Sequence, residues 1–304
     1  MPTDLDAYQR VYKLEHAVTD ARARQAVNGF LRPFVAFCAG RDPTAEILKD
    51  WRAHLLHSMK ASSRNRYMKA VKAYLSYLHD VEGLKLTPEE VARILKPFKE
   101  PSRIPHVWDS DQLRKLLPAV VTHANRPKRE NLGIGVLLML CAGLRPGEAI
   151  SLRRQDIDLK HSWMNVFASK TQKERRIPLD SPALLDLFSR LWKKREPEET
   201  WFKPGNNYRQ IPFEPWRELL QIAKLKKEPP KILRATHVAH VASSHRFSTY
   251  ELTGRFGHSE KISHQFYYQP MPDVQGDNVD QWLGCAAELQ KLVDHIVRAE
   301  FKVE

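Results

Sequence analysis

Residues 231–268 read KILRATHVAHVASSHRFSTYELTGRFGHSEKISHQFYY. This segment brings Lys231, Arg234, His258 and Tyr267 close together in the chain. Arg234 falls at the start of an expected helix, where backbone N–H groups add positive potential for an anion. A tyrosine hydroxyl has an ordinary pKa near 10 and becomes a nucleophile when a neighbouring group takes its proton. The segment therefore combines anion-binding groups, a proton carrier and a nucleophile.

The same segment contains further histidines, at His237, His240, His245 and His264. A metal site built on them would need a carboxylate or a cysteine at a suitable spacing to complete its ligands. None stands there, so we predict no metal site and no cofactor.

Upstream, residues 142–152 read AGLRPGEAISL. Arg145 follows an apolar run and Gly143, and Pro146 is a good first residue for the next helix. Two interpretations stand for this arginine. It forms a salt bridge to Glu148, or its planar guanidinium binds a phosphate through two parallel hydrogen bonds.

Between these blocks, residues 169–179 read SKTQKERRIPL, with Lys170 at the start of an expected β-turn. A lysine in a turn is usually solvated. A turn can also deliver an ammonium group into a groove, as a phosphate contact or as a proton donor to a leaving alkoxide. Lys173 and Arg175 follow closely, and we predict that both contact nucleic acid.

In this order, Arg145, Lys170, Lys231-x-x-Arg234, Gly257-His258 and Tyr267 resemble the active-site signature of the tyrosine recombinases, or phage integrase family. The resemblance covers residues 140–268, and Tyr267 follows His258 by the nine residues that the family pattern requires. One departure is Lys231, because the family usually has histidine at that position. The neighbouring Tyr268 would be the nucleophile if the register shifted by one residue.

The resemblance implies a site-specific recombinase that cuts and rejoins double-stranded DNA through a 3′-phosphotyrosyl link to Tyr267. Arg145 and Arg234 would neutralise the phosphate, and His258 would help to deprotonate the tyrosine. Lys170 would protonate the leaving 5′ oxygen, with Lys231 assisting at the phosphate. Such enzymes need neither ATP nor metal, assemble as tetramers on DNA, and serve integration or mobile genetic elements.

The rest of the chain predicts two domains. Apolar residues recur at helical spacing between 20 and 96, and the segment KPFKEPSRIP, residues 96–105, cannot continue a helix. We therefore expect a helical domain with its linker at 1–103 and a second domain at 104–304, and the resemblance implies that these are a core-binding domain and a catalytic domain. A helix at 62–79, capped by Ser62 and Ser63, carries a charged face that is simply solvated or contacts DNA, made of Arg64, Arg66, Lys69 and Lys72.

The catalytic region predicts a mainly α fold with a small antiparallel three-stranded sheet at 154–180. Helical patterns occupy 181–194, 212–224 and 235–256. The apolar stripe of a last helix at 279–302 either completes its own core or, as the resemblance implies, docks on a neighbouring protomer.

Composition agrees with a nucleic-acid partner, since 49 Lys and Arg against 36 Asp and Glu leave a charge of +13. The three cysteines, Cys38, Cys141 and Cys285, are far apart in sequence and suggest a reducing compartment. Residues 1–16 lack an apolar stretch, and no run is long enough to cross a bilayer. We predict a cytoplasmic protein without a membrane partner.

Three other interpretations use the same residues. A catalytically inactive DNA-binding protein would keep the fold, with Lys231 as the trace of lost activity. A type IB topoisomerase or a telomere resolvase would keep the nucleophile and change the outcome. A basic helical protein in which each of these residues is merely structural is the third, and the agreement of five residues in order and spacing argues against it.

Overall fold

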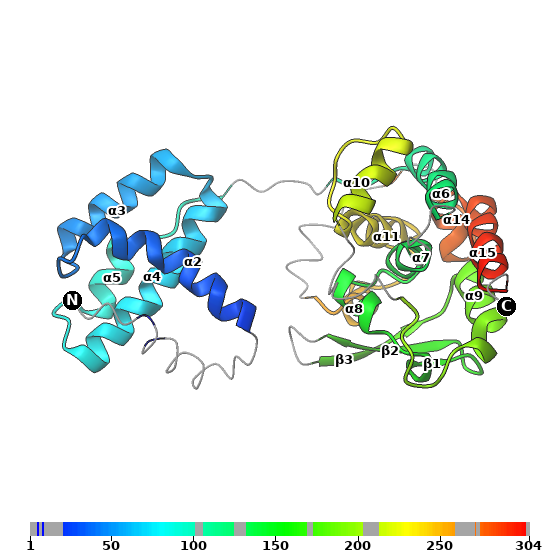
Figure 1. Ribbon diagram of the computed structural model, residues 1–304, viewed down its shortest axis with the longest axis horizontal. Coiled ribbons are helices and arrows are strands. Elements are labelled where there is room, and N and C mark those ends of the chain that lie inside the picture. The colour runs from blue at the N-terminus through cyan, green and yellow to red at the C-terminus, as the bar shows by residue number, and fades with distance from the viewer. Residues whose placement is uncertain are drawn as a thin grey trace. The chain divides into compact units, whose positions relative to one another are not determined.

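The structure is a computed structural model that describes residues 5, 8, 21–100, 106–124, 132–168, 173–202, 213–258, 271 and 274–301. For 21–28, 124 and 213 it describes the backbone alone. The chain divides into two compact units, Met1–Ser102 and Arg103–Glu304 (Figure 1).

The N-terminal unit contains α2 (Ala21–Cys38), α3 (Ala45–Ser58), α4 (Ala61–Glu82) and α5 (Pro88–Ile94). Helix α3 starts where the Thr44 side chain accepts the Ile47 amide, and α5 starts at a capping box of Thr87 and Glu90. Trp51, Tyr74 and other buried side chains form a core separate from that of the second unit. The prediction that Ser62 and Ser63 cap this helix is wrong, because α4 begins at Ala61 and both serines lie in its first turn.

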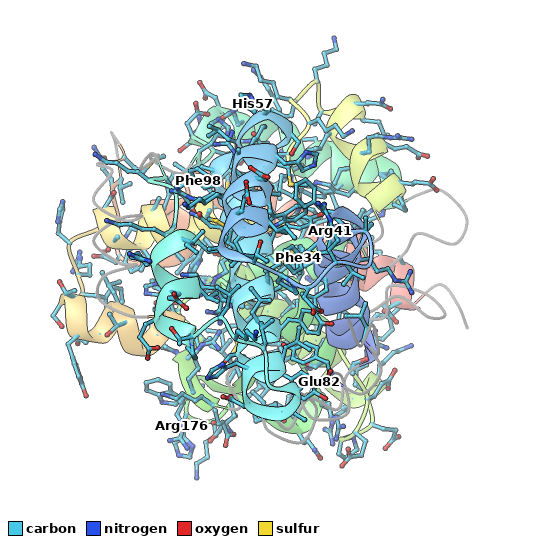
Figure 2. All side chains as sticks on the ribbon, turned by 90° about the vertical axis from the view of Figure 1, so that its left-hand side faces the viewer. Phe34, Arg41, His57, Glu82, Phe98 and Arg176 are labelled. Carbon is cyan, nitrogen blue, oxygen red and sulfur yellow. The ribbon has the colours of Figure 1, made fainter. Side chains whose placement is uncertain are left out.

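The first residues after α5 are held against this unit. The Asn65 side chain accepts the Phe98 amide at 2.8 Å and donates to the Phe98 carbonyl at 2.9 Å. The guanidinium groups of Arg52 and Arg64 lie over the Phe98 ring, 4.7 Å and 5.2 Å from its centre. Figure 2 labels Phe98. Part of the expected linker is therefore anchored to α4 by side chains.

The C-terminal unit begins with α6 (Ser110–Ala124), α7 (Leu132–Cys141) and α8 (Pro146–Ser151). All residues of α7 are buried, so it forms the centre of the core. Asp109 and Gln112 cap α6 reciprocally, side chain to backbone amide. Further along lie the 3₁₀ turn η1 (Arg154–Asp156), α9 (Pro182–Leu191), η2 (Trp192–Lys194), α10 (Phe213–Ile222), α11 (Lys231–Ser243), α12 (Thr249–Phe256), α14 (Val279–Trp282) and α15 (Ala286–Phe301).

A small sheet lies on one side of these helices (Figure 1). It consists of β1 (Ile157–Asp158), β2 (Trp163–Ala168) and β3 (Lys173–Pro178), antiparallel in that order. Val166 pairs with Arg175, and Asn165 with Arg176. The predicted fold class, mainly α with a three-stranded antiparallel sheet, is confirmed.

Two predicted helices are each divided in the structure. The expected helix at 235–256 is α11 and α12, separated around His245, whose φ is +55°. The expected helix at 279–302 is α14 and α15, separated at Gly284 with φ +66°. The apolar stripe of α15 packs on α6, α7 and α9, so it completes the core of its own unit. Within the described ranges, no helix has both the length and the apolarity needed to cross a membrane.

Candidate active site

The turn between α7 and α8 places Arg145. Helix α7 ends at Cys141, and the chain turns at Gly143, whose φ of +64° is left-handed, so that the Leu144 amide bonds back to the Leu138 carbonyl. A Cβ at Gly143 would lie 2.5 Å from the His237 ring, so glycine is required by space as well as by conformation. Pro146 then starts α8 immediately, and the Arg145 side chain stays 36% exposed.

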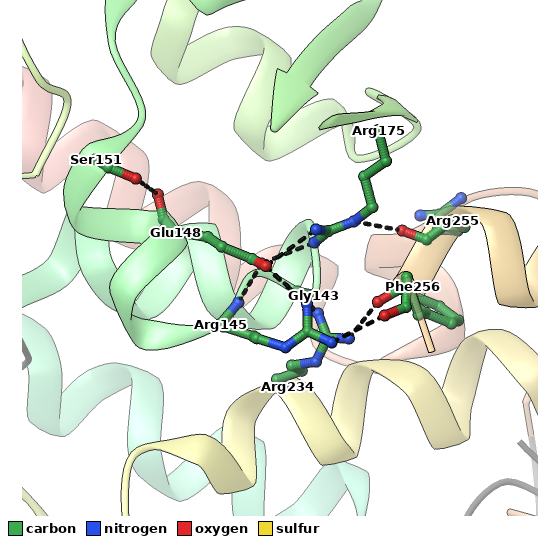
Figure 3. Close-up of polar contacts among 9 residues, drawn as sticks. Gly143, Arg145, Glu148, Ser151, Arg175, Arg234, Arg255 and Phe256 are labelled. Carbon is green, nitrogen blue, oxygen red and sulfur yellow. Dashed lines mark hydrogen bonds and ion pairs between the residues drawn. The ribbon is translucent and has the colours of Figure 1, made fainter. Parts of the chain in front are cut away.

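Glu148, one turn into α8, is the buried anion of the site, with a side chain 5% exposed. Its carboxylate accepts the Arg145 backbone amide at 2.8 Å and Arg145 Nη1 at 2.7 Å. Arg175 adds a two-pronged contact, at 2.9 Å and 2.7 Å (Figure 3). Burial by itself raises the pKa of Glu148, but the hydrogen bonds and charge of Arg175, with those of Arg145, outweigh it and lower the pKa to about 2.

The end of α12 is the second half of the site. Three successive carbonyls there each accept a hydrogen bond from a different arginine (Figure 3). Arg175 Nε donates to residue 255 at 3.1 Å, Arg234 Nη2 to residue 256 at 2.7 Å, and Arg145 Nη2 to residue 257 at 3.1 Å. The last carbonyls of a helix lack partners within it and carry partial negative charge, which suits cationic donors.

Arg234 reaches this point from α11, and its side chain is 11% exposed. Its Nη1 donates to the Gly143 carbonyl and lies 3.9 Å from Glu148 Oε2. Lys231, the first residue of α11, is exposed one turn before it. Three guanidinium groups and one carboxylate thus meet, which leaves a net charge of about two positive in a partly buried place.

His258 directly follows the arginine-bound carbonyls. It comes after Gly257, whose φ of +60° ends α12. The half-buried ring of His258 stacks on Phe256, with ring centres 5.7 Å apart and planes 27° apart. The backbone that the three arginines hold therefore also sets the place of this histidine.

His237 lies beneath the site and is fully buried. Its Nδ1 donates to the Leu140 carbonyl at 2.7 Å, and its ring is nearly perpendicular to that of Phe256, with centres 5.6 Å apart. Burial, followed by the charges of Arg255 and Arg234, lowers the pKa of His237 well below its usual value. His237 is thus a neutral packing group. In the part of the chain that the structure covers, no group of three or more His, Cys, Asp or Glu side chains could hold a metal ion.

The structure brings Arg145, Arg234 and His258 together, with Lys231 one turn from Arg234. Lys170, Tyr267 and Tyr268 fall outside the described residues. Lys173 is exposed at the start of β3. The predicted DNA contacts Arg64, Arg66, Lys69 and Lys72 all belong to α4, in the other unit, and Arg66 and Lys69 are exposed there.

Arg175 is the residue whose surroundings differ most from the sequence-based expectation of a DNA contact. Its side chain is 9% exposed, and the donors named above face Glu148 and α12. The alternation of side chains along a strand could have indicated this position, because Arg175 shares a face of β3 with Ile177, which is buried. Sequence reasoning also missed Arg255, whose buried guanidinium binds both oxygens of Asp180 at 2.6 Å and 2.7 Å.

Comparison with known proteins places this chain in a family. The chain is 26% identical to tyrosine recombinase XerA of Pyrococcus furiosus over 66% of its own length and 68% of that relative. It is 30% identical to tyrosine recombinase XerC of Pelobacter propionicus over 51% of its length and 52% of the relative.

Solved structures share the fold. A lambda integrase dimer bound to a COC′ core site matches with a TM-score of 0.63 at 16% identity, over 90% of this chain and 96% of that one. The Tn1549 transposon integrase in complex with transposon right-end DNA matches with a TM-score of 0.62 at 15% identity, over 88% and 95%. The model of the phage integrase family matches residues 106–272, more than half of the 304, and the chain belongs to that family of tyrosine recombinases.

Proposed function

We propose that the protein is a site-specific DNA recombinase, an integrase that cleaves and rejoins strands through a 3′-phosphotyrosyl intermediate on Tyr267. The observation that carries the proposal is the convergence of Arg145 and Arg234 on consecutive carbonyls directly before His258. Tyr267 follows that histidine by nine residues. Phosphate-binding groups, a proton carrier and a nucleophile are therefore close along the chain or in space.

The arginine pair suits a phosphodiester, whose negative charge repels nucleophiles. Catalysis must stabilise the charge that builds on the non-bridging oxygens, and groups fixed in advance do this best. Arg145 uses two of its five N–H donors on Glu148 and Gly257, so its fork has further donors for a phosphate. Glu148 holds that guanidinium in place before the substrate arrives.

The proton transfers fall to the remaining residues. The Tyr267 hydroxyl attacks phosphorus as His258 helps to remove its proton, and the P–O5′ bond breaks. Lys170 donates a proton to the departing 5′ oxygen, while Lys231 supplies a point charge to the phosphate. A 5′-hydroxyl of the partner strand then attacks the phosphotyrosine. Because the energy of the bond is retained, the cycle requires no ATP, and the arginines neutralise the phosphate without a metal ion.

The proposed substrate is a double-stranded recombination site, on which the protein assembles as a tetramer. The charge of +13 favours phosphate contacts, and the exposed Arg66 and Lys69 on α4 and Lys173 on β3 are our candidates for them. A cytoplasmic location agrees with these assignments.

Covalent capture tests the proposal and identifies the recombination site in the same experiment. The purified protein is incubated with sheared genomic DNA of its source, denatured, and recovered with any attached DNA, which is sequenced. A nicked duplex built from the enriched sequence then serves as a suicide substrate, because the short strand diffuses away after cleavage and traps the adduct.

We expect an adduct with wild type and with Tyr268→Phe but not with Tyr267→Phe. Loss in Tyr268→Phe alone would move the nucleophile by one residue. Retention of specific genomic fragments by undenatured wild type, without any adduct after denaturation, would instead favour an inactive DNA-binding protein. Relaxation of a supercoiled plasmid lacking the site would favour a topoisomerase.

A further inference from the structure

Arg175 is a largely buried cation, 9% exposed, outside the set of residues to which the proposed chemistry gives a role. Its Nη1 and Nη2 bond the two oxygens of Glu148, and its Nε bonds the carbonyl of Arg255. Two of the three donors point toward α8, and the third points toward the end of α12 (Figure 3). A guanidinium is the one side chain whose rigid fork can make both contacts at once.

The packing around Arg175 agrees with a fixed position. A Cβ placed on Gly257 would lie 3.2 Å from Arg175 Cδ, so the side chain passes directly beside the turn that precedes His258. On the Glu148 side, the carboxylate that Arg175 holds is the one that bonds both the amide and the guanidinium of Arg145. Arg175 therefore contacts what positions Arg145 on one side and what positions His258 on the other.

Its neighbour Arg176 makes a useful contrast. Arg176 is exposed on β3 (Figure 2), and its Nε donates to the Asn165 side chain on β2 at 3.3 Å. The alternation of side chains along a strand puts the two arginines on opposite faces of the sheet. One arginine faces the site and the next faces away, with the same charge.

The geometry points to Arg175 as a positioning residue for strand cleavage, which joins α8 to the end of α12 and so fixes Arg145 relative to His258. This inference rests on the proposed function, because it assigns Arg145 and His258 to the reaction. Arg175 itself touches neither DNA nor the reacting atoms. Without it, DNA still binds, but the phosphate-binding arginine and the histidine lose their mutual alignment.

The test compares Arg175→Gln, Arg175→Lys and the matched control Arg176→Gln on the nicked duplex from the capture experiment. Two quantities are measured for each: the single-turnover rate of adduct formation and the equilibrium affinity for the duplex at several salt concentrations. We expect Arg175→Gln to slow cleavage about a hundredfold, the scale of a small misplacement of reacting groups. Affinity should stay within about twofold, and the salt slope should be unchanged.

Arg175→Lys keeps the charge but not the fork, so we expect a loss of about tenfold in the cleavage rate. If Arg175→Gln does not fold, the rate and affinity of Arg175→Lys provide the test instead. Arg176→Gln should cleave at the wild-type rate. A loss of affinity in Arg175→Gln with a salt slope lower by about one would make Arg175 a DNA contact and overturn the inference.

A pH profile separates positioning from a general loss of structure. Wild-type Glu148 is ionised throughout the working range, because its pKa is about 2. In Arg175→Gln, burial remains while the main opposing interactions are gone, so the pKa of Glu148 rises and cleavage should fall at acidic pH. Wild type also loses activity at acidic pH as the general base is protonated, so the comparison is with the wild-type profile. The double variant Arg175→Gln/Glu148→Gln should lack the additional fall and keep only the one that wild type shows. An additional fall that persists in the double variant would show that Arg175 does not act through Glu148.

Hydrogen exchange of the α12 segment provides a readout independent of activity. Amides at 249–258 should exchange faster in Arg175→Gln than in Arg176→Gln, because a held carbonyl is released. Absence of an adduct with wild type would refute the proposed function but leave this expectation in force. Unchanged exchange and unchanged cleavage in Arg175→Gln would refute the positioning role alone.

Discussion

At the scale of single residues, Glu148 determines how the stability of the C-terminal unit falls at acidic pH. Its folded pKa of about 2 lies below the ordinary value of 4.5, so its contribution to stability is complete above the ordinary value and is lost as the pH falls toward 2. The difference corresponds to about 3 kcal/mol. We expect Glu148→Gln to lower the free energy of unfolding of the C-terminal unit by about this amount at neutral pH.

Urea unfolding of wild type and Glu148→Gln at a series of pH values checks this sign. The gap between the two proteins should be widest near neutrality and should narrow as the pH approaches 3. A gap of constant size would mean that the carboxylate charge contributes nothing to folding.

Gly257 offers a second prediction at this scale. Its φ of +60° disfavours any side chain, and an added Cβ would lie 3.2 Å from Arg175 Cδ, closer than an ordinary contact. Gly257→Ala should therefore reduce unfolding stability by about 1–2 kcal/mol. Gly254 is the control, since it lies inside α12 with nothing within 4 Å of an added Cβ. Gly254→Ala should raise the melting temperature slightly, by helix propensity; equal effects in thermal unfolding would contradict the argument.

At the scale of elements, a buried acid ties α14 to the start of α9. The carboxylate of Asp280 accepts the Ser181 hydroxyl and the Ala183 amide, so a residue distant in sequence completes the cap of α9. Burial raises the pKa of Asp280, and its hydrogen bonds oppose that rise. We expect Asp280→Ala to cost about 2–3 kcal/mol in chemical denaturation. Asp294→Ala, which removes an exposed partner of Arg190, should unfold close to wild type.

The segment after α5 that Asn65 holds through the Phe98 backbone gives a second prediction at this scale. Asn65→Ala removes both hydrogen bonds to the Phe98 backbone, and the segment should open more often. We expect trypsin to cut after the exposed Lys99 about tenfold faster, the effect of about 1.4 kcal/mol. Ser63→Ala, exposed on the same helix, is the control, and equal cleavage of the two variants would show that Asn65 does not hold the segment.

At the scale of the whole molecule, a charge of +13 makes DNA binding depend strongly on salt. Fluorescence anisotropy with a labelled duplex at several salt concentrations gives the slope of log affinity against log salt. Arg66→Ala and Lys69→Ala should each reduce that slope by about one if they contact phosphates. Arg64→Ala should leave the slope unchanged and lower the melting temperature, because its guanidinium bonds the carbonyls of Leu56 and Met59. The reverse pattern would exchange the roles of these residues.

The family and most of the fold could be predicted from the amino-acid sequence. The order and spacing of Arg145, Arg234, His258 and Tyr267 can be read directly along the chain. The apolar periods of the helices and the alternation in β2 can be read in the same way. The contact between Arg145 and Glu148 was also within reach, because residues three apart share a helix face.

Only the tertiary structure revealed which groups hold the site together. Arg175 meets Glu148 across 27 positions and the carbonyl of Arg255 across 80, and Arg145 meets Gly257 across 112. Contacts between residues so far apart have no fixed spacing, so no sequence pattern predicts them. In addition, a charged residue on a strand is expected to face solvent. The sequence determined which chemistry-bearing groups the protein carries, and folding decided which arginines would face a phosphate and which would hold the others in place.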